Sequence, residues 1–284
     1  MAATPTKVLI VSNFIADDFY AAMNTTREEW EEDIVARIKV MVRAIAPRVF
    51  GTESVAFSLV NIADASAEEI ITQLETVQLA VFSGGPQNIR DTKAEHLAEA
   101  DRLRDVLAAA LERFEQGVLP DLRLITLCLS HQVLGELLQM EVVDSGESQL
   151  KREYRPMKVC LPKAEDKVRL EPVDEEDDLV EGLALHRYHV RFRESEPDAP
   201  LRAVEFASLH HEDWCNDKIC YGMLVYDPQG EVRIVSTQFH PEANFCADST
   251  EEQRDRMTGL IGNAFGARAA VPQALSPEKT GKNP

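Results

Sequence analysis

A strand pattern runs directly into a helix pattern in the stretch Leu124-Ile-Thr-Leu-Cys128-Leu-Ser-His-Gln-Val-Leu-Gly135. The apolar run that ends at Cys128 is typical of a buried strand, and a helix is predicted to begin shortly after it. Such a turn, a nucleophile elbow, exposes its central side chain above the sheet at the positive end of the helix. A thiol there gains thiolate character, which makes Cys128 a candidate nucleophile. The alternative is that Cys128 is a small core residue at the end of a strand.

Strand-like and helix-like segments alternate on both sides of this stretch. The strand-like segments are residues 7–12, 55–60, 77–82 and 122–127, and the helix-like ones are residues 30–45, 66–74, 97–114 and 131–140. Thr25 and Thr26, followed by Glu28 and Glu29, predict overlapping capping boxes at the start of the first helix, and Pro47 predicts its end. The alternation predicts an α/β fold in which helices cover both faces of a parallel sheet.

Shorter strand-like segments begin after Glu141. They are residues 157–161, 167–170, 187–192, 204–208, 219–226 and 232–238. The stretch Tyr226-Asp-Pro-Gln-Gly230-Glu predicts a turn between the last two, and Ser249 with Glu252 predicts the cap of a final helix. We therefore expect one α/β domain over residues 1–266, with a small antiparallel addition, and a flexible C-terminal tail over residues 267–284.

The composition excludes several classes of protein. Lys and Arg number 30 and Asp and Glu number 49, so a net charge of −19 would repel phosphate backbones and we expect no nucleic-acid partner. No run approaches the roughly 18 apolar residues of a membrane span, and the first residues lack a secretory layout, so we expect no membrane association. Five cysteines at irregular spacing favour reduced thiols over a disulfide framework. These features predict a cytoplasmic protein.

Two further motifs could complete a site around Cys128. Ser83-Gly84-Gly85-Pro86 follows a predicted strand at the sheet edge where Cys128 is expected to emerge, and glycines let the backbone present N–H groups to an oxyanion. Val235-Ser-Thr-Gln-Phe-His240-Pro-Glu242 ends a strand in a histidine, with a carboxylate two residues later. His240 could act as a base and Glu242 could orient it. Taken alone, each motif is also typical of an ordinary turn or loop.

The three motifs together resemble the class I (triad) glutamine amidotransferase domain. The resemblance rests on Cys128-Leu-Ser-His-Gln, Ser83-Gly-Gly-Pro and Gln238-Phe-His-Pro-Glu, and it extends from Lys7 to about Phe245. It implies a flavodoxin-like, three-layer fold with a parallel sheet. It also implies hydrolysis of the L-glutamine side-chain amide through a γ-glutamyl thioester, with delivery of the ammonia to a synthase.

The resemblance also implies roles for single residues. Cys128 would be the nucleophile, His240 the base and Glu242 its orienting partner, in a Cys-His-Glu triad. The backbone N–H groups of Gly85 and Leu129 would hold the oxyanion. The residues implied to bind the glutamine substrate are Gly84, Gln132, Tyr188, His189 and Val190. This chemistry requires no metal and no organic cofactor, so we expect neither.

One segment narrows the resemblance to a branch of the family. Arg187-Tyr188-His189 is similar to a segment of anthranilate synthase component II and its aminodeoxychorismate relatives, where the backbone just after the His holds the α-amino acid end of glutamine. Val190 stands where those proteins usually have Ser. The sequence Cys-Leu-Ser-His-Gln-Val-Leu is most similar to the corresponding motif of phenazine-type aminodeoxyisochorismate synthases. The branch implies a chorismate-derived or other specialised-metabolite acceptor.

Three features depart from the family pattern or stand outside it. Family elbows usually read Gly-x-Cys-x-Gly, whereas Thr126 and Ser130 flank Cys128 here; both are small, so the catalytic prediction stands. The segment at residues 17–46 is longer than the usual first loop, and it could reshape the partner interface or the glutamine entrance, or be a harmless extension. Zinc-ligand residue types also gather in one segment, but their spacing fits no common structural zinc site, and we predict no metal there. They are His210, His211, Cys215 and Cys220.

The predicted function is therefore a glutaminase subunit that supplies ammonia to an ammonia-accepting synthase on a separate chain. One alternative is a free-standing γ-glutamyl hydrolase or transferase, which would use the same thioester and turn over γ-glutamyl amines without a partner. The other is an interaction protein whose elbow, flanked by Thr126 and Ser130, is catalytically silent. It would bind a partner tightly and form no covalent intermediate.

Overall fold

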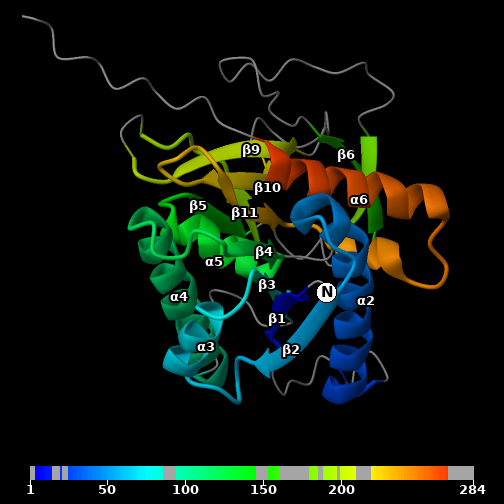
Figure 1. Cartoon of the computed structure of the whole chain (residues 1–284), viewed down its shortest axis with the longest axis horizontal. Helices are drawn as coiled ribbons and strands as arrows, with labels where there is room; N and C mark the ends of the chain where they lie inside the picture. Colours follow the sequence, from blue (N-terminus) through cyan, green and yellow to red (C-terminus); the bar gives the residue numbers. More distant parts are fainter. Residues whose placement is uncertain are drawn as a thin grey trace, which may run out of the picture.

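Eleven strands form a single sheet in the part of the chain that the structure describes (Figure 1). This computed structural model describes residues 4–14, 20, 25–85, 94–144, 153–159, 179–184, 188–196, 199–208 and 219–267. Five strands lie side by side in parallel, and six strands extend the sheet in antiparallel fashion. The predicted α/β fold, a flavodoxin-like parallel sheet with an antiparallel addition, is confirmed.

The parallel strands follow the order β2-β1-β3-β4-β11. Their bounds are β1 Thr6–Ser12, β2 Val55–Asn61, β3 Leu79–Phe82, β4 Arg123–Leu127 and β11 Val232–Thr237. This order is that of flavodoxin-like doubly wound sheets, in which ligands bind beyond the carboxyl ends of the strands. β3, β4 and β11 are direct neighbours, so the segments that follow them emerge at one edge of the sheet.

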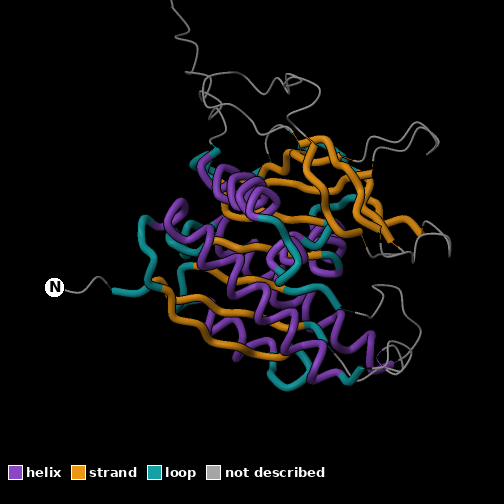
Figure 2. Tube along the Cα trace, turned by 90° about the vertical axis from the view of Figure 1, so that its right-hand side faces the viewer, coloured by secondary structure: helices purple, strands orange, loops and turns teal. Residues whose placement is uncertain are grey.

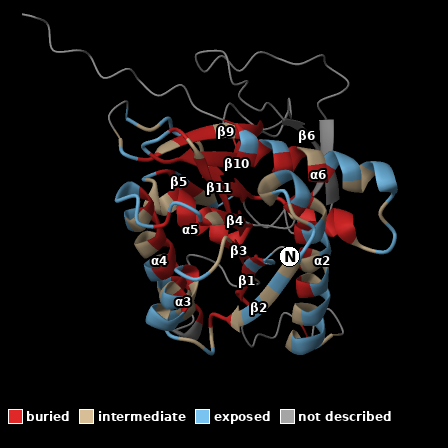
Figure 3. Cartoon of the chain, viewed as in Figure 1, coloured by how far each residue is buried: buried red, intermediate tan, exposed pale blue. Residues whose placement is uncertain are grey.

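Helices cover both faces of the parallel strands because successive strand side chains point to opposite faces. Val8 and Ile10 of β1 belong to the core cluster that includes α2 (Arg27–Phe50) and α6 (Glu251–Gly266). Leu9 and Val11 belong to the opposite cluster, which includes α3 (Ala67–Leu74), α4 (Ala94–Glu115) and α5 (Leu129–Leu137). Figure 1 shows these two layers on either side of the sheet, and Figure 3 shows that their sheet-facing sides are buried.

The antiparallel strands extend the sheet from β11. They are β5 (Glu141–Asp144), β6 (Glu153–Val159), β7 (Leu179–Ala184), β8 (Tyr188–Arg191), β9 (Arg202–Ser208) and β10 (Ile219–Tyr226). β10 pairs with β11, β9 and β8, and β8 pairs in turn with β5. Figure 2 shows these strands stacked above the parallel part. β5 and β7 have no counterpart in the sequence prediction.

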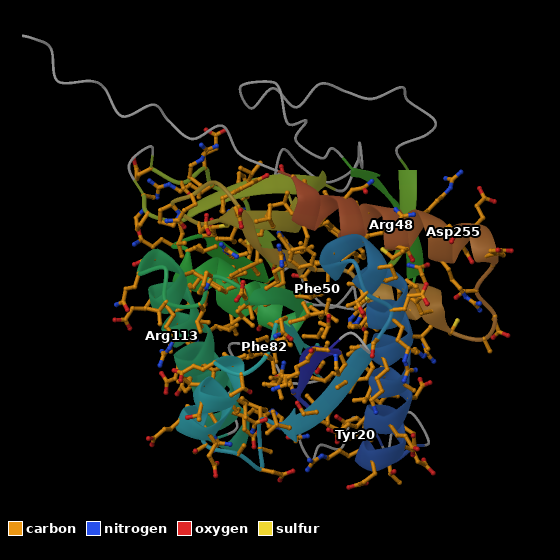
Figure 4. The ribbon with its side chains drawn as sticks, in the orientation of Figure 1. Tyr20, Arg48, Phe50, Phe82, Arg113 and Asp255 are labelled. Atoms are coloured by element: carbon orange, nitrogen blue, oxygen red, sulfur yellow. The ribbon has the colours of Figure 1, made fainter. Side chains whose placement is uncertain are left out.

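The helix boundaries correct two predictions. The capping box of α2 is formed by Thr26 and Glu29, as expected, but the helix continues through Pro47 to its αL cap at Gly51. Pro47 has no N–H to donate to the carbonyl of Arg43 and its ring crowds that carbonyl, but the αL cap at Gly51, whose N–H donates to Pro47 O, closes one more turn beyond it. The cap of α6 is formed by Thr250 and Gln253, one residue later than predicted, and its box is complete. Figure 4 shows Arg48, near the end of α2, beside α6.

Several predictions fall outside the described residues. They include the predicted strand at residues 167–170, Pro86 of the glycine motif, Arg187 of the branch motif, and residues 268–284 of the predicted tail. His210, His211 and Cys215 also lie outside the described residues. Among the helices that are described, none is long and apolar enough to cross a membrane.

Candidate active site

Cys128 lies at the sharp turn between β4 and α5 with a strained backbone. Its φ of 49° and ψ of −102° are rare for an L-residue, and only one other non-glycine residue in the described part of the chain, Gln139, has a positive φ. Such a conformation costs about 1–3 kcal/mol and persists only where the surroundings hold it. Here the backbone N–H of Cys128 donates to Thr237 O at 2.8 Å, and its carbonyl accepts from Gln132 N at 3.1 Å. The predicted elbow is present.

His240 and Glu242 follow β11, the neighbour of β4, and lie next to Cys128. His240 Nδ1 is 2.7 Å from Glu242 Oε1, on the short 3-10 helix η2 (Pro241–Phe245). A side-chain hydrogen bond joins His240 to Cys128 as well. The backbone N–H of His240 donates to Leu183 O of β7 at 3.0 Å, so the antiparallel part also holds the histidine. The structure therefore brings the three predicted triad residues into one chain of contacts.

The electrostatics of this chain favour a charged histidine. Burial alone would lower the pKa of His240, whose side chain is only 16% exposed. The charges of Glu242 and Cys128, and the hydrogen bonds from both, outweigh that effect and raise the pKa well above its ordinary value. The carboxylate of Glu242 is itself only 1% exposed, so little water screens it from the imidazole. An imidazolium in contact with Sγ is the arrangement that activates a thiol as a nucleophile.

The glycine loop after β3 lies against both the cysteine and the histidine. A Cβ atom placed on Gly84 would be 3.1 Å from Cys128 Cβ and 3.0 Å from His240 Cε1, so a side chain there would crowd both. The loop starts at Ser83, directly after Phe82, which Figure 4 labels in the middle of the molecule. Gly85 is the next residue, half-buried at the end of the described segment.

Leu129, the other predicted oxyanion residue, is the first residue of α5. The first N–H groups of an α-helix have no intrahelical acceptor and lie at the positive end of the helix dipole. The N–H of Leu129 is therefore suited to bind a developing negative charge beside Cys128. The predicted oxyanion site pairs this N–H with that of Gly85, in the glycine loop.

The two residues that flank the elbow in place of the family's glycines are fully buried and hydrogen-bonded. Thr126 Oγ1 is 2.5 Å from Ser236 Oγ on β11. Ser130 Oγ donates to Ser83 O at 2.8 Å and accepts from Asn13 Nδ2 at 2.8 Å. Each hydroxyl thus connects the elbow to a neighbouring strand. This gives Thr126 and Ser130 a structural role beside Cys128.

Asn13 contacts the candidate site, although the sequence-based prediction assigned it no catalytic or binding role. It follows β1, and its backbone N–H donates to Ser83 Oγ at 2.9 Å while its side chain reaches Ser130. These contacts tie the ends of β1 and β3 to the start of α5. The available signal was its position, because Asn13 is a polar residue directly after a buried strand at the sheet edge that carries Cys128.

Besides Gly84 in the glycine loop, the predicted substrate-binding residues lie in two elements, α5 and β8. Gln132 is buried near the elbow, and its Nε2 donates to Tyr188 O at 2.8 Å, which brings the start of β8 next to α5. Val190 and His189 are buried in β8, and the two methyl groups of Val190 fill the space left by the missing side chain of Gly135. The side chain of Val190 is thus part of the core, which leaves only its backbone for the predicted substrate contact.

The described residues contain no group of three His, Cys, Asp or Glu side chains that could hold a metal ion. Cys220, one of the zinc-ligand types noted in the sequence, is fully buried in β10, and this burial raises the pKa of its thiol. His131, next to the elbow, is also fully buried, and burial lowers its pKa to about 3. The side chain of His131 is therefore neutral. It packs below the site, with its Nδ1 2.8 Å from Ser236 Oγ.

Comparison with solved structures shows where this fold occurs. A Thermoplasma acidophilum protein described as a GMP synthase subunit is 18% identical, with 93% of this chain and 98% of that chain covered and a TM-score of 0.50. The Trypanosoma brucei CTPS glutaminase domain with bound acivicin is 13% identical, with 96% and 98% covered and a TM-score of 0.51. PurLQS from Thermotoga maritima is 12% identical, with 91% and 99% covered and a TM-score of 0.51. No family model and no curated protein matches the chain.

Proposed function

We propose that this protein is a glutaminase that hydrolyses L-glutamine through a γ-glutamyl thioester on Cys128 and supplies the ammonia to a partner synthase. The observation that carries the proposal is the contact chain from Cys128 through His240 to Glu242, at a strained strand-to-helix turn that faces the glycine loop. A nucleophile, a base and an orienting carboxylate in this order are the parts needed for acyl transfer.

In the first half of the reaction, the Sγ thiolate of Cys128 attacks the side-chain amide carbon of glutamine and a C–S bond forms. The N–H groups of Gly85 and Leu129 stabilise the charge that develops on the amide oxygen. The imidazolium of His240 gives its proton to the amide nitrogen, the C–N bond breaks, and ammonia leaves. Glu242 keeps the imidazole in position and stabilises its positive charge throughout.

In the second half, water attacks the thioester carbon while His240 takes a proton from it. The C–S bond breaks, glutamate leaves, and the original pair of Cys128 and His240 is restored. Because ammonia becomes protonated in bulk water, a partner that docks over the carboxyl edge of the sheet would capture it before it escapes. This argument favours a complex with a synthase over release into solvent.

The fold-level comparisons support the same proposal. The Trypanosoma brucei structure is described as a glutaminase domain with bound acivicin, and the Thermoplasma acidophilum protein belongs by its description to a GMP synthase. Both share this fold at low sequence identity, which makes amidotransferase chemistry a reasonable proposal for this chain. The proposal itself rests on the geometry of the site.

The branch of metabolism belongs to the proposal as well. The resemblance of Arg187-Tyr188-His189 and of the elbow wording to chorismate-type amidotransferases favours an acceptor derived from chorismate or another specialised metabolite. In this proposal the backbone beyond His189 and the side chain of Gln132 hold the α-amino acid end of glutamine. Co-purification of a chorismate-using synthase with the protein, and glutamine-dependent amination by the pair, would support this assignment.

The experiment that tests the proposal is intact-mass analysis after exposure to the electrophilic glutamine analogue diazo-oxo-norleucine. We expect one adduct per chain in the wild-type protein and none in Cys128→Ala. The matched control is Cys246→Ala, which removes a half-exposed thiol whose pKa is lowered mainly by a hydrogen bond from Ser249, and it should keep the adduct. An adduct that survives in Cys128→Ala would contradict the proposal.

Two further outcomes would point to the alternatives. Turnover of γ-glutamyl amines by the protein alone would favour a free-standing hydrolase or transferase. Tight binding to a partner, without any adduct on Cys128 even in cell extract, would favour a silent interaction protein. Both experiments use the same preparations as the labelling test.

A further inference from the structure

Gln238, a residue to which the family resemblance gives no role, contacts the sulfur of Cys128. Its Nε2 lies 3.7 Å from Sγ, within reach of a hydrogen bond to sulfur, and its side chain is fully buried. Its backbone N–H donates to Tyr221 O on β10 at 2.9 Å, which fixes the residue against the neighbouring strand. The contact with Cys128 is therefore made by a side chain that has little freedom to move away.

The surrounding hydrogen bonds determine which end of the Gln238 amide faces the sulfur. Gln132 Nε2 lies 3.4 Å from Gln238 Oε1, and an NH₂ group can only donate to that oxygen. The oxygen of Gln238 thus faces Gln132, and its NH₂ group faces Cys128. Gln132 is held in turn by its 2.8 Å hydrogen bond to Tyr188 O. A continuous chain of hydrogen bonds runs from Tyr188 through the two glutamines to the sulfur.

We propose that Gln238 donates a hydrogen bond that stabilises the thiolate of Cys128 and holds it in position for attack, and that Gln132 orients this donor. The inference rests on the proposed function and adds a residue to its machinery. A hydrogen bond to an ionised acceptor is stronger than a neutral one, and exclusion of water at a fully buried amide strengthens it further.

The two histidines near Cys128 contribute in a different way from Gln238. His240, paired with Glu242, supplies a positive charge and exchanges protons during the reaction. His131, in α5 behind the elbow, stays neutral because burial lowers its pKa to about 3. Gln238 is a neutral donor that can stabilise negative charge on sulfur without gaining or losing a proton. The NH₂ group of Gln238 would also hold the sulfur from a second side, in addition to the contact that His240 makes with it.

The test is the pH dependence of Cys128 alkylation by iodoacetamide in the full chain, read as modification of the peptide that contains Cys128. Gln238→Met keeps a side chain of similar size and removes the donor. We expect alkylation at pH 7 to slow about tenfold and the half-maximal rate to move about one pH unit upward. Gln132→Met should shift the profile in the same direction by less, because the donor remains but loses its orienting partner.

Ser236→Ala is the matched control. Ser236 is fully buried on β11, two residues before Gln238, and its hydroxyl contacts Thr126 and His131. Removing it perturbs the same part of the core, and we expect a wild-type alkylation profile. If Gln238→Met does not fold, Gln238→Asn keeps a polar amide and withdraws the donor by one methylene, and the same upward shift is expected. Equal profiles in the wild type, the Gln238 variant and Ser236→Ala would overturn the inference.

The outcome is separable from that of the proposed function. Iodoacetamide needs neither glutamine nor a partner, so the profile reports the environment of the sulfur alone. Failure of the glutamine analogue to label the wild-type protein would count against glutaminase activity and would leave the Gln238 measurement intact. A normal label together with an unshifted Gln238→Met profile would retain the activity and remove Gln238 from its machinery.

Discussion

The two ends of strands β4 and β11 are held by different kinds of polar contact. At the carboxyl ends, neutral hydrogen bonds hold the backbone, such as that between Thr126 and Ser236, and the pair of His240 and Glu242 supplies charge next to Cys128. At the amino ends, Arg233 of β11 forms ion pairs with Asp227 at 2.6 Å and with Glu231 at 3.2 Å. One end thus concentrates charge next to the sulfur of Cys128, and the other uses charge to join strands.

This difference has a physical reason. Neutral hydrogen bonds fix positions without adding a strong field, so the His240–Glu242 pair dominates the potential at the sulfur. At the other end, burial and the charge of Arg233 lower the pKa of Arg123, which shows that cations crowd one another there. We therefore expect substitutions in the charged pair at the carboxyl ends to change turnover most, and substitutions in the neutral contacts there or at the amino ends to change mainly stability.

Glu242→Gln is expected to have the largest effect on turnover among the variants that keep the nucleophile. The amide retains the size of the side chain but loses the charge that raises the pKa of His240, and it allows the wrong imidazole tautomer. We expect kcat for glutamine hydrolysis to fall by about three to four orders of magnitude. The alkaline limb of the residual activity should move to lower pH, because a less stabilised imidazolium loses its proton earlier. A pH–rate profile measures both.

Stability should respond in the corresponding direction. The folded-state pKa of His240 lies above its ordinary 6.5, so protonation favours the folded protein. This contribution is complete below about pH 6.5 and is lost as the pH rises through the higher folded-state value. The wild type should therefore exceed Glu242→Gln in free energy of unfolding by more at pH 6 than at pH 9. Glu231→Gln, at the other end of β11, is the control and should leave the pH–rate profile unchanged.

Gly84→Ala should have an intermediate effect. The new methyl group would lie 3.0 Å from His240 Cε1 and 3.1 Å from Cys128 Cβ, so both side chains must shift by a few tenths of an ångström. We expect kcat to fall about tenfold, with little change in the melting temperature, because misplacement of reacting groups costs rate steeply. Gly117→Ala provides the contrast: its φ of 67° makes alanine strained, but nothing lies within 4 Å. That variant should lose stability and keep its turnover.

Ser130→Ala removes a hydroxyl from the neutral contacts. Ser130 connects Ser83 O to Asn13 Nδ2, and both partners lose a hydrogen bond in the variant. We expect a loss of about 0.5–1.5 kcal/mol in the free energy of unfolding, because Asn13 Nδ2 still donates directly to Ser83 O. Turnover should fall only a few-fold, since the histidine pair is untouched. Urea denaturation with parallel glutaminase assays separates the two effects, and an unchanged unfolding free energy would show that these contacts do not hold the elbow.

Much of the candidate site could be predicted from the sequence, because its main residues stand in short local motifs. Cys128 directly follows β4 and His240 lies three residues after β11, and parallel strands bring such ends to one edge. The hydrogen bonds of Asn13 to Ser83 and Ser130 join residues 70 and 117 positions apart, and no local pattern reports such contacts. Gln238 lay within a recognised motif, but its contact with the sulfur depends on how Gln132 packs behind it. The helix end at Pro47 was predicted wrongly, because the αL cap at Gly51 closes one more turn beyond the proline.

Asp227→Asn should have the smallest effect on turnover and a large effect on stability. Asp227 and Arg233 are buried, with side chains 2% and 7% exposed, and Asp227 Oδ1 also accepts from the backbone N–H groups of Gln229 and Glu231. These bonds close the turn between β10 and β11 that the sequence predicts. Removing the charge of Asp227 leaves the buried Arg233 with only the more exposed Glu231 as a counter-charge, at a cost of up to about 3–5 kcal/mol.

Thermal unfolding and glutamine turnover, measured on the same Asp227→Asn preparation, decide whether the two ends act independently. If the neutral contacts at the carboxyl ends hold the site by themselves, the variant should melt at a lower temperature and keep wild-type kcat well below that melting point. A fall in kcat at such temperatures would mean that the ion pairs position β11, and with it His240, over its whole length. The separation between a stabilising end and a reacting end would then be wrong.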